Sequence, residues 1–156
     1  MDKKIDTFVK QSLTIFIILL PIALITGPFL SDLLISLSSI IFIFYCIYFK
    51  NFKYFNNSFF KFFLIFYLLC LLSALLSEFK LISSIKSFFY FRFGVFAIAF
   101  NFVLSANKKL IKLLFISLFL CFLILILDGF FEYITGANIL GNPKHGVRLS
   151  SFFGDE

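Results

Sequence analysis

The sequence predicts an all-α protein, a polytopic bundle with about five transmembrane helices. Of its residues, 62% are hydrophobic and only 14% are charged, whereas a soluble domain needs more charge on its surface. The apolar residues form blocks close to the roughly 17–25 residues with which a helix crosses a bilayer. These blocks are apolar on all sides and lack the alternation typical of membrane β-barrels. We therefore expect helices, which satisfy their own backbone polar groups in lipid.

The first three spans follow from the positions of these blocks. After the polar segment MDKKIDTFVK, the first span is expected near 12–27, where Gly27-Pro28 stops a helix. The second span is expected near 30–49. The polar stretch KNFKYFNNS then separates it from the third, which is expected near 59–77.

The last two spans complete an expected transmembrane region of residues 1–128. The loop SEFKLISSIKS precedes a fourth span near 88–105, and SANKK precedes a fifth near 110–127. Asp128 marks the return to water. Residues 129–156 are expected to form a loop segment outside the membrane.

The distribution of lysine and arginine predicts the orientation of the chain, because cytoplasmic loops carry an excess of these residues. Three segments fall on one side, namely the N-terminal segment, the loop after the second span and the loop after the fourth. Together they carry Lys3, Lys4, Lys10, Lys50, Lys53, Lys61, Lys108, Lys109 and Lys112. The other side has Lys80, Lys86, Lys144 and Arg148. The N-terminus is therefore expected inside and the C-terminal tail outside.

The orientation accounts for most of the lysine and arginine residues, so little positive charge is left to indicate another function. The net charge of +6 is mostly an orientation signal, so no nucleic-acid partner is expected. Cys46, Cys70 and Cys121 lie in separate apolar blocks without metal-ligand spacing, and we expect them to pack as small apolar residues. His145, the single histidine, has no partners at ligand spacing. We expect neither a metal nor a cofactor.

Arg92 is the one arginine within a predicted span, in SFFYFRFGVF near the outer end of the fourth. An arginine inside a span is costly and suggests a functional site. The alternative is that its long side chain reaches the interface. If Arg92 is functional, its guanidinium suits an anionic head group, because it binds phosphate in a two-pronged manner and stays charged.

The tail carries the most specific pattern. Its run DGFFEYITGANILG, followed by RLSSFFGDE, resembles the segment after the fifth span in the O-antigen ligase and polymerase superfamily. The family pattern has an acidic residue at the membrane exit, a G-x-N/D-x-x-G turn, and an arginine followed by a small residue, an aromatic residue and a short polar end. The matching residues are Asp128, Gly136, Asn138, Gly141, Arg148, Phe152, Phe153, Gly154, Asp155 and Glu156.

This resemblance implies an enzyme of lipopolysaccharide O-antigen biosynthesis in the bacterial inner membrane. Such proteins transfer a glycan from a polyprenyl diphosphate carrier to an acceptor on the periplasmic side, either the lipid A core or a growing glycan. Arginines of the family hold the diphosphate and a histidine of a later loop is thought to act as base. Arg148 is the residue that its place in the motif carries over as diphosphate-binding, and Arg92 is a looser candidate.

Family members have further spans after this motif, and the chain stops where the next should begin. We therefore expect an N-terminal fragment that is inactive alone, with no catalytic residue assigned within it. Two other readings are open. The chain could be a small non-enzymatic accessory protein of the membrane, or a fragment of a transporter or flippase. The latter calls for polar or broken helices near mid-membrane, and only Pro21 interrupts a predicted span.

Overall fold

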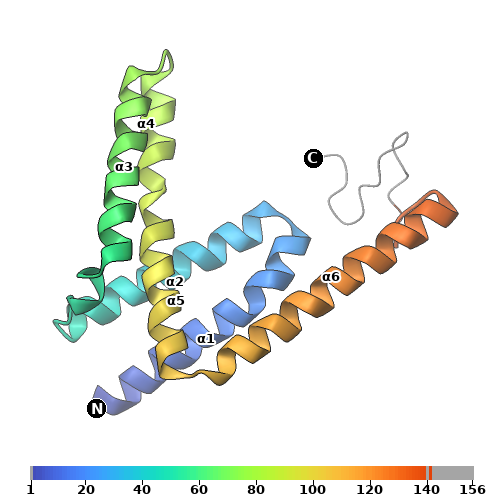
Figure 1. The fold of residues 1–156 in the computed structure, drawn as a ribbon, viewed down its shortest axis with the longest axis horizontal. Coiled ribbons are helices and arrows are strands. Elements are labelled where there is room, and N and C mark those ends of the chain that lie inside the picture. The colour runs from blue at the N-terminus through green and yellow to red at the C-terminus, as the bar shows by residue number, and fades with distance from the viewer. Residues whose placement is uncertain (1, 140, 142–156) are drawn as a thin grey trace. The chain divides into compact units, whose positions relative to one another are not determined.

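The computed structural model describes residues 2–139 and 141, and in this part of the chain all regular structure is helical. The helices are α1 (Asp2–Thr26), α2 (Pro28–Tyr48), α3 (Ser58–Leu76), α4 (Lys80–Phe89), α5 (Phe91–Ala106) and α6 (Lys109–Thr135), with a 3₁₀ turn, η1 (Lys53–Phe55), between α2 and α3 (Figure 1). Helices α4 and α5 together form one candidate span of 27 residues. Five helical segments are thus long and apolar enough to cross a membrane, which indicates a multi-pass membrane protein.

Three helix boundaries differ from those expected from the sequence. Helix α1 begins at Asp2 instead of near residue 12, because Asp6 and Lys10 pair across one helical turn. The fourth span begins at Lys80 instead of residue 88. Helix α6 runs on to Thr135, so that the first residues of the expected periplasmic loop segment are helical.

The turns between helices have identifiable local causes. Gly27 has a φ of +128°, which is open to glycine, and Pro28 then starts α2 at the position where a missing N–H costs nothing. The side chain of Asn57 caps α3 by accepting a hydrogen bond of 2.7 Å from the Phe60 N–H. Gly136 ends α6 in the left-handed conformation, with a φ of +80°.

The chain divides into two compact units, and the first comprises residues 1–14 and 35–107. In this unit α3 and α4 lie side by side as an antiparallel hairpin (Figure 1). Helix α5 continues from α4 and also contacts α3, where the ring of Phe63 packs directly over Gly94. A Cβ atom at residue 94 would overlap that ring, so glycine sets the close approach of the two helices.

One end of the first unit is closed by aromatic and polar contacts. The ring of Phe42 packs against Tyr54 of η1 and Phe102 of α5. The Tyr45 hydroxyl donates a hydrogen bond of 2.8 Å to Asp6, which also pairs with Lys10 at 2.7 Å. These contacts bring together the start of α1, the end of α2 and the end of α5.

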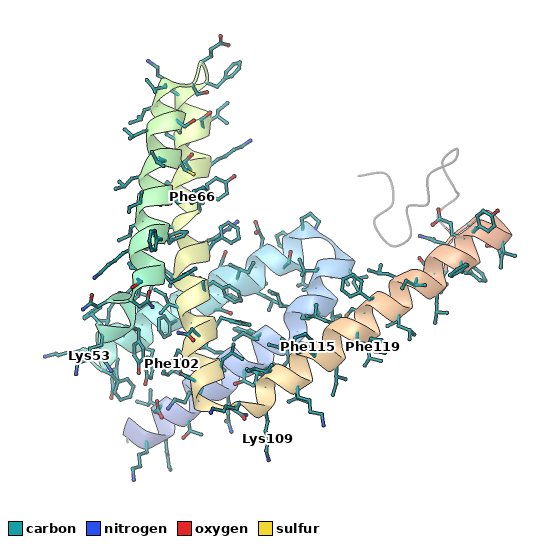
Figure 2. All side chains as sticks on the ribbon, viewed as in Figure 1. Lys53, Phe66, Phe102, Lys109, Phe115 and Phe119 are labelled. Atoms are coloured by element: carbon teal, nitrogen blue, oxygen red, sulfur yellow. The ribbon has the colours of Figure 1, made fainter. Side chains whose placement is uncertain are left out.

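The second unit comprises residues 15–34 and 108–156, of which the structure describes 15–34, 108–139 and 141. The Ser117 hydroxyl of α6 donates to the Ile18 carbonyl of α1 at 3.4 Å. Most of the apolar surface of α6 is exposed, and Figure 2 shows Phe115 and Phe119 projecting from it. Lipid would cover such a surface in a membrane, where a helix can be apolar all round.

Candidate anion-binding site

Arg92 lies directly after the junction of α4 and α5 at Tyr90, where the backbone stays in the helical region but the hydrogen bonds tighten to the i→i−3 pattern. The Tyr90 N–H bonds to the Ser87 carbonyl, and the Tyr90 carbonyl accepts from the Phe93 N–H. The Phe88 carbonyl at this junction accepts a hydrogen bond of 3.3 Å from the Tyr67 hydroxyl of α3. A neighbouring helix thus supplies a partner where the helical ladder is irregular, as lipid requires.

Two serines of α2 hold Arg92 in place. The Arg92 Nη1 atom donates to the Ser36 hydroxyl at 3.1 Å, and the Ser39 hydroxyl donates to the Arg92 carbonyl at 2.8 Å. Ser36 and Ser39 lie three residues apart and therefore on one face of the helix. Arg92 as a whole is half-buried.

The depth of Arg92 in its span differs from the sequence-based expectation, which placed it near the outer end. The span runs from Lys80 to Ala106, and Arg92 lies next to its middle. The residues that line the same groove also lie at the middle of their helices. Tyr67 is the middle residue of α3, and Ser36 and Ser39 flank the middle of α2. All three helices therefore place Arg92 at mid-span.

Helix α4 could instead lie flat on the membrane surface, because its serines and lysines give it a polar face. It runs alongside α3, however (Figure 1), and two of its serines contact that helix or the residue that follows it. Ser83 contacts Ser77 at 3.1 Å, and Ser87 donates to the Cys70 carbonyl at 3.5 Å. Helices α4 and α5 together form one candidate span, and it runs beside the candidate span formed by α3.

An apolar groove of about 550 Å³ opens beside Arg92. Its walls come from α2, α3, α4 and α5, and its polar groups are Arg92, Ser36, Ser39 and the Tyr67 hydroxyl. The remaining lining residues are Ile40, Ile43, Phe88, Phe89, Phe91 and Val95. A cation at the edge of an apolar groove of this size suits an amphiphile with a negatively charged head.

The described residues of the tail motif form the C-terminal cap of α6. The Asp128 carboxylate accepts a hydrogen bond of 2.9 Å from the Ile139 N–H, and the Asn138 carbonyl accepts one of 2.9 Å from the Gly141 N–H. Asp128 and Glu132 are completely buried, one turn apart on α6. Gly136 and Gly141 both have positive φ angles. The G-x-N-x-x-G pattern therefore has a structural role, as a turn folded back onto Asp128.

The structure describes only one of the two arginines that the sequence suggests as binding residues. Arg92 lies in a groove with polar partners, while Arg148 lies outside the described residues, as does His145. Sequence reasoning missed Ser36, Ser39 and Tyr67. The feature of the sequence that could have identified them is a hydroxyl group near the centre of an otherwise apolar block.

Within the described residues there is no group of three or more His, Cys, Asp or Glu side chains that could hold a metal ion. No protein-family model, curated protein or solved structure matches the chain.

Proposed function

We propose that this chain is the N-terminal membrane part of a glycan ligase or polymerase of the O-antigen type, in a bacterial inner membrane. It would move a glycan from a polyprenyl diphosphate carrier to an acceptor on the periplasmic side, either the lipid A core or a growing glycan. The observation that carries the proposal is Arg92, presented at mid-span on the edge of an apolar groove. The family is proposed because the tail pattern around Asp128 and Arg148 resembles the motif of the O-antigen ligase and polymerase superfamily.

In such a transfer, the acceptor oxygen forms a bond to the anomeric carbon of the glycan as the bond from that carbon to the phosphate oxygen breaks. The acceptor proton passes to a base, and the polyprenyl diphosphate leaves with the electron pair. Negative charge therefore builds up on the diphosphate, and a fixed guanidinium stabilises it strongly where water is excluded. Arg92 is the described residue that fits this role, and Arg148 is its proposed partner.

The proposed orientation, with the N-terminus inside, also has support in the fold. The start of α1 and the ends of α2 and α5 meet at one end of the first unit, through the contacts of Asp6, Tyr45 and Phe102. The segments rich in lysine adjoin these helix ends. A single positively charged end is what the cytoplasmic side of a membrane protein requires.

Deletion of the gene, followed by complementation, tests the proposal. We expect the deletion to abolish polymeric glycan on lipopolysaccharide, and the wild-type gene to restore it. Arg92→Ala should fail to restore it at wild-type protein abundance, while Lys61→Ala, a change at an exposed lysine of α3 outside the groove, should succeed. Unchanged glycan after deletion, or full rescue by Arg92→Ala, would contradict the proposal.

A second candidate function is transport of the lipid-linked glycan across the membrane. The irregular hydrogen bonding at Tyr90, near the middle of a candidate span, favours it, because interrupted helices form the substrate sites of many transporters. The two functions differ in where lipid-linked glycan accumulates after deletion. A missing ligase leaves it in the outer leaflet, open to glycosidase added to spheroplasts, and a missing transporter leaves it protected in the inner leaflet.

A further inference from the structure

A second groove lies between the beginning of α3 and the later part of α5, within the first unit. It measures about 430 Å³ and is apolar apart from two asparagines. Phe59 and Asn101 are exposed, so the groove opens onto the surface of the unit. Its main lining residues are Asn57, Phe59, Phe96, Ala97, Phe100 and Asn101.

The two asparagines of this groove differ in their hydrogen bonds. The Asn57 amide group donates to the Tyr54 carbonyl at 3.1 Å, and its side-chain oxygen accepts from the Phe60 N–H at 2.7 Å. The Asn101 side chain, by contrast, forms no hydrogen bond with any of the described residues. It therefore presents a donor and an acceptor on the exposed side of α5.

The depth of Asn101 makes an unbonded amide costly. The middle residue of the candidate span Lys80–Ala106 is Phe93, and Asn101 follows it by eight residues. That spacing corresponds to about 12 Å along the helix axis, whereas half of the hydrocarbon core measures about 15 Å. Asn101 thus lies within the hydrocarbon, where a polar group costs free energy unless it is hydrogen-bonded.

We infer that this surface of α5 is a contact between two copies of the chain, in which the two Asn101 amides hydrogen-bond to each other. Copies inserted in the same orientation carry Asn101 at the same depth, so a twofold axis along the membrane normal brings the two side chains together. A carboxamide is complementary to itself, because each donates through its N–H and accepts through its oxygen. Any other partner needs a polar group at that depth, and a second copy always has one.

The neighbours of Asn101 on α5 suit such a contact. Ala97 lies one turn before it on the same face, and its small side chain lets two helix backbones approach closely. The opposite face of α5 is buried within the unit, at Val95, Ala99 and Phe102. The face with Ala97 and Asn101 is therefore the one that is available to a second copy.

Sedimentation equilibrium of the purified chain in detergent tests the inference. We expect the wild-type chain to show a monomer–dimer equilibrium. Asn101→Ala should raise the dissociation constant of the dimer about tenfold or more, because two hydrogen bonds between helices are lost. Asn101→Gln keeps the amide and should dimerise more tightly than Asn101→Ala. Ala97→Leu keeps Asn101 but separates the backbones, so it should also weaken the dimer.

The matched control is Asn56→Ala, which removes an exposed asparagine of the turn between η1 and α3 that does not line the groove. It should leave the dissociation constant unchanged, and far-UV circular dichroism should show equal helicity in all variants. A monomeric wild-type chain, or equal dissociation constants for the wild type and Asn101→Ala, would overturn the inference.

Unfolding by SDS provides a second readout. At concentrations where the wild type is monomeric, Asn101→Ala should unfold at the same SDS fraction as the wild type. A less stable Asn101→Ala monomer would place the partner of the amide within its own chain and refute the contact between copies. The inference concerns assembly alone, so it does not depend on the glycan function.

Discussion

The contact between Gly94 and Phe63 allows a quantitative test of the packing that builds the groove. Gly94 lies two residues after Arg92, and the Phe63 ring packs over it one turn from Tyr67. The change Gly94→Ala forces the ring to move, and overpacking of this kind costs roughly 1–3 kcal/mol. The same change also raises helix propensity, which offsets about 0.5–1 kcal/mol.

Gly129→Ala is the matched control, because no atom lies within 4 Å of a Cβ atom at this helical position. It carries the propensity gain alone and should stabilise the protein by about 0.5–1 kcal/mol. The difference between the two variants therefore isolates the clash, which we expect at about 1–3 kcal/mol.

The assay is unfolding by SDS in mixed micelles, followed by far-UV circular dichroism, with the free energy of unfolding compared between the variants. Equal unfolding free energies for Gly94→Ala and Gly129→Ala would refute the close packing of α3 against α5.

Two further predictions concern single interactions. Ser39→Ala removes the hydroxyl that donates to the Arg92 carbonyl, and the free energy of unfolding in SDS should fall by about 0.6 kcal/mol. Ser105→Ala removes a hydrogen bond within one helix and should lower it by less. Equal losses would contradict the role of Ser39 in linking two helices. Gly136→Ala strains a left-handed residue by about 1–2 kcal/mol, so hydrogen exchange should quicken in the last turn of α6, and unchanged exchange there would argue against this cap.

The number of spans could be predicted from the sequence because apolar block length alone determines it. Helix ends could not, because a polar residue within a helix looks the same in the sequence as one that marks the return to water. The segment that includes Ser83 and Ser87 reads as a loop, yet these serines face α3 and continue the helix. Asp128 reads as a terminus, yet its carboxylate is buried and accepts the Ile139 N–H.

The longer candidate span, Lys80–Ala106, also changes how Arg92 is interpreted. With a helix starting at residue 88, Arg92 falls near the interface, where its charge needs no further explanation. With the helix starting at Lys80, Arg92 lies near the middle of the span, where an arginine costs about 2.5–3.5 kcal/mol on insertion scales. The hydroxyls that accompany it come from α2 and α3, and no local pattern around Arg92 reveals them.

The depth of Arg92 in the membrane is directly measurable, because the sequence contains no tryptophan. Single tryptophans can replace three exposed phenylalanines, namely Phe89 near the α4–α5 junction, Phe66 near the middle of α3 (Figure 2) and Phe79 at the α3–α4 turn. Quenching by lipids brominated at different depths of the acyl chain then reports the depth of each. We expect Phe89→Trp and Phe66→Trp to be quenched most by deep bromines, and Phe79→Trp by shallow ones. Quenching of Phe89→Trp by the same shallow bromines as Phe79→Trp would place Arg92 at the interface and contradict the account.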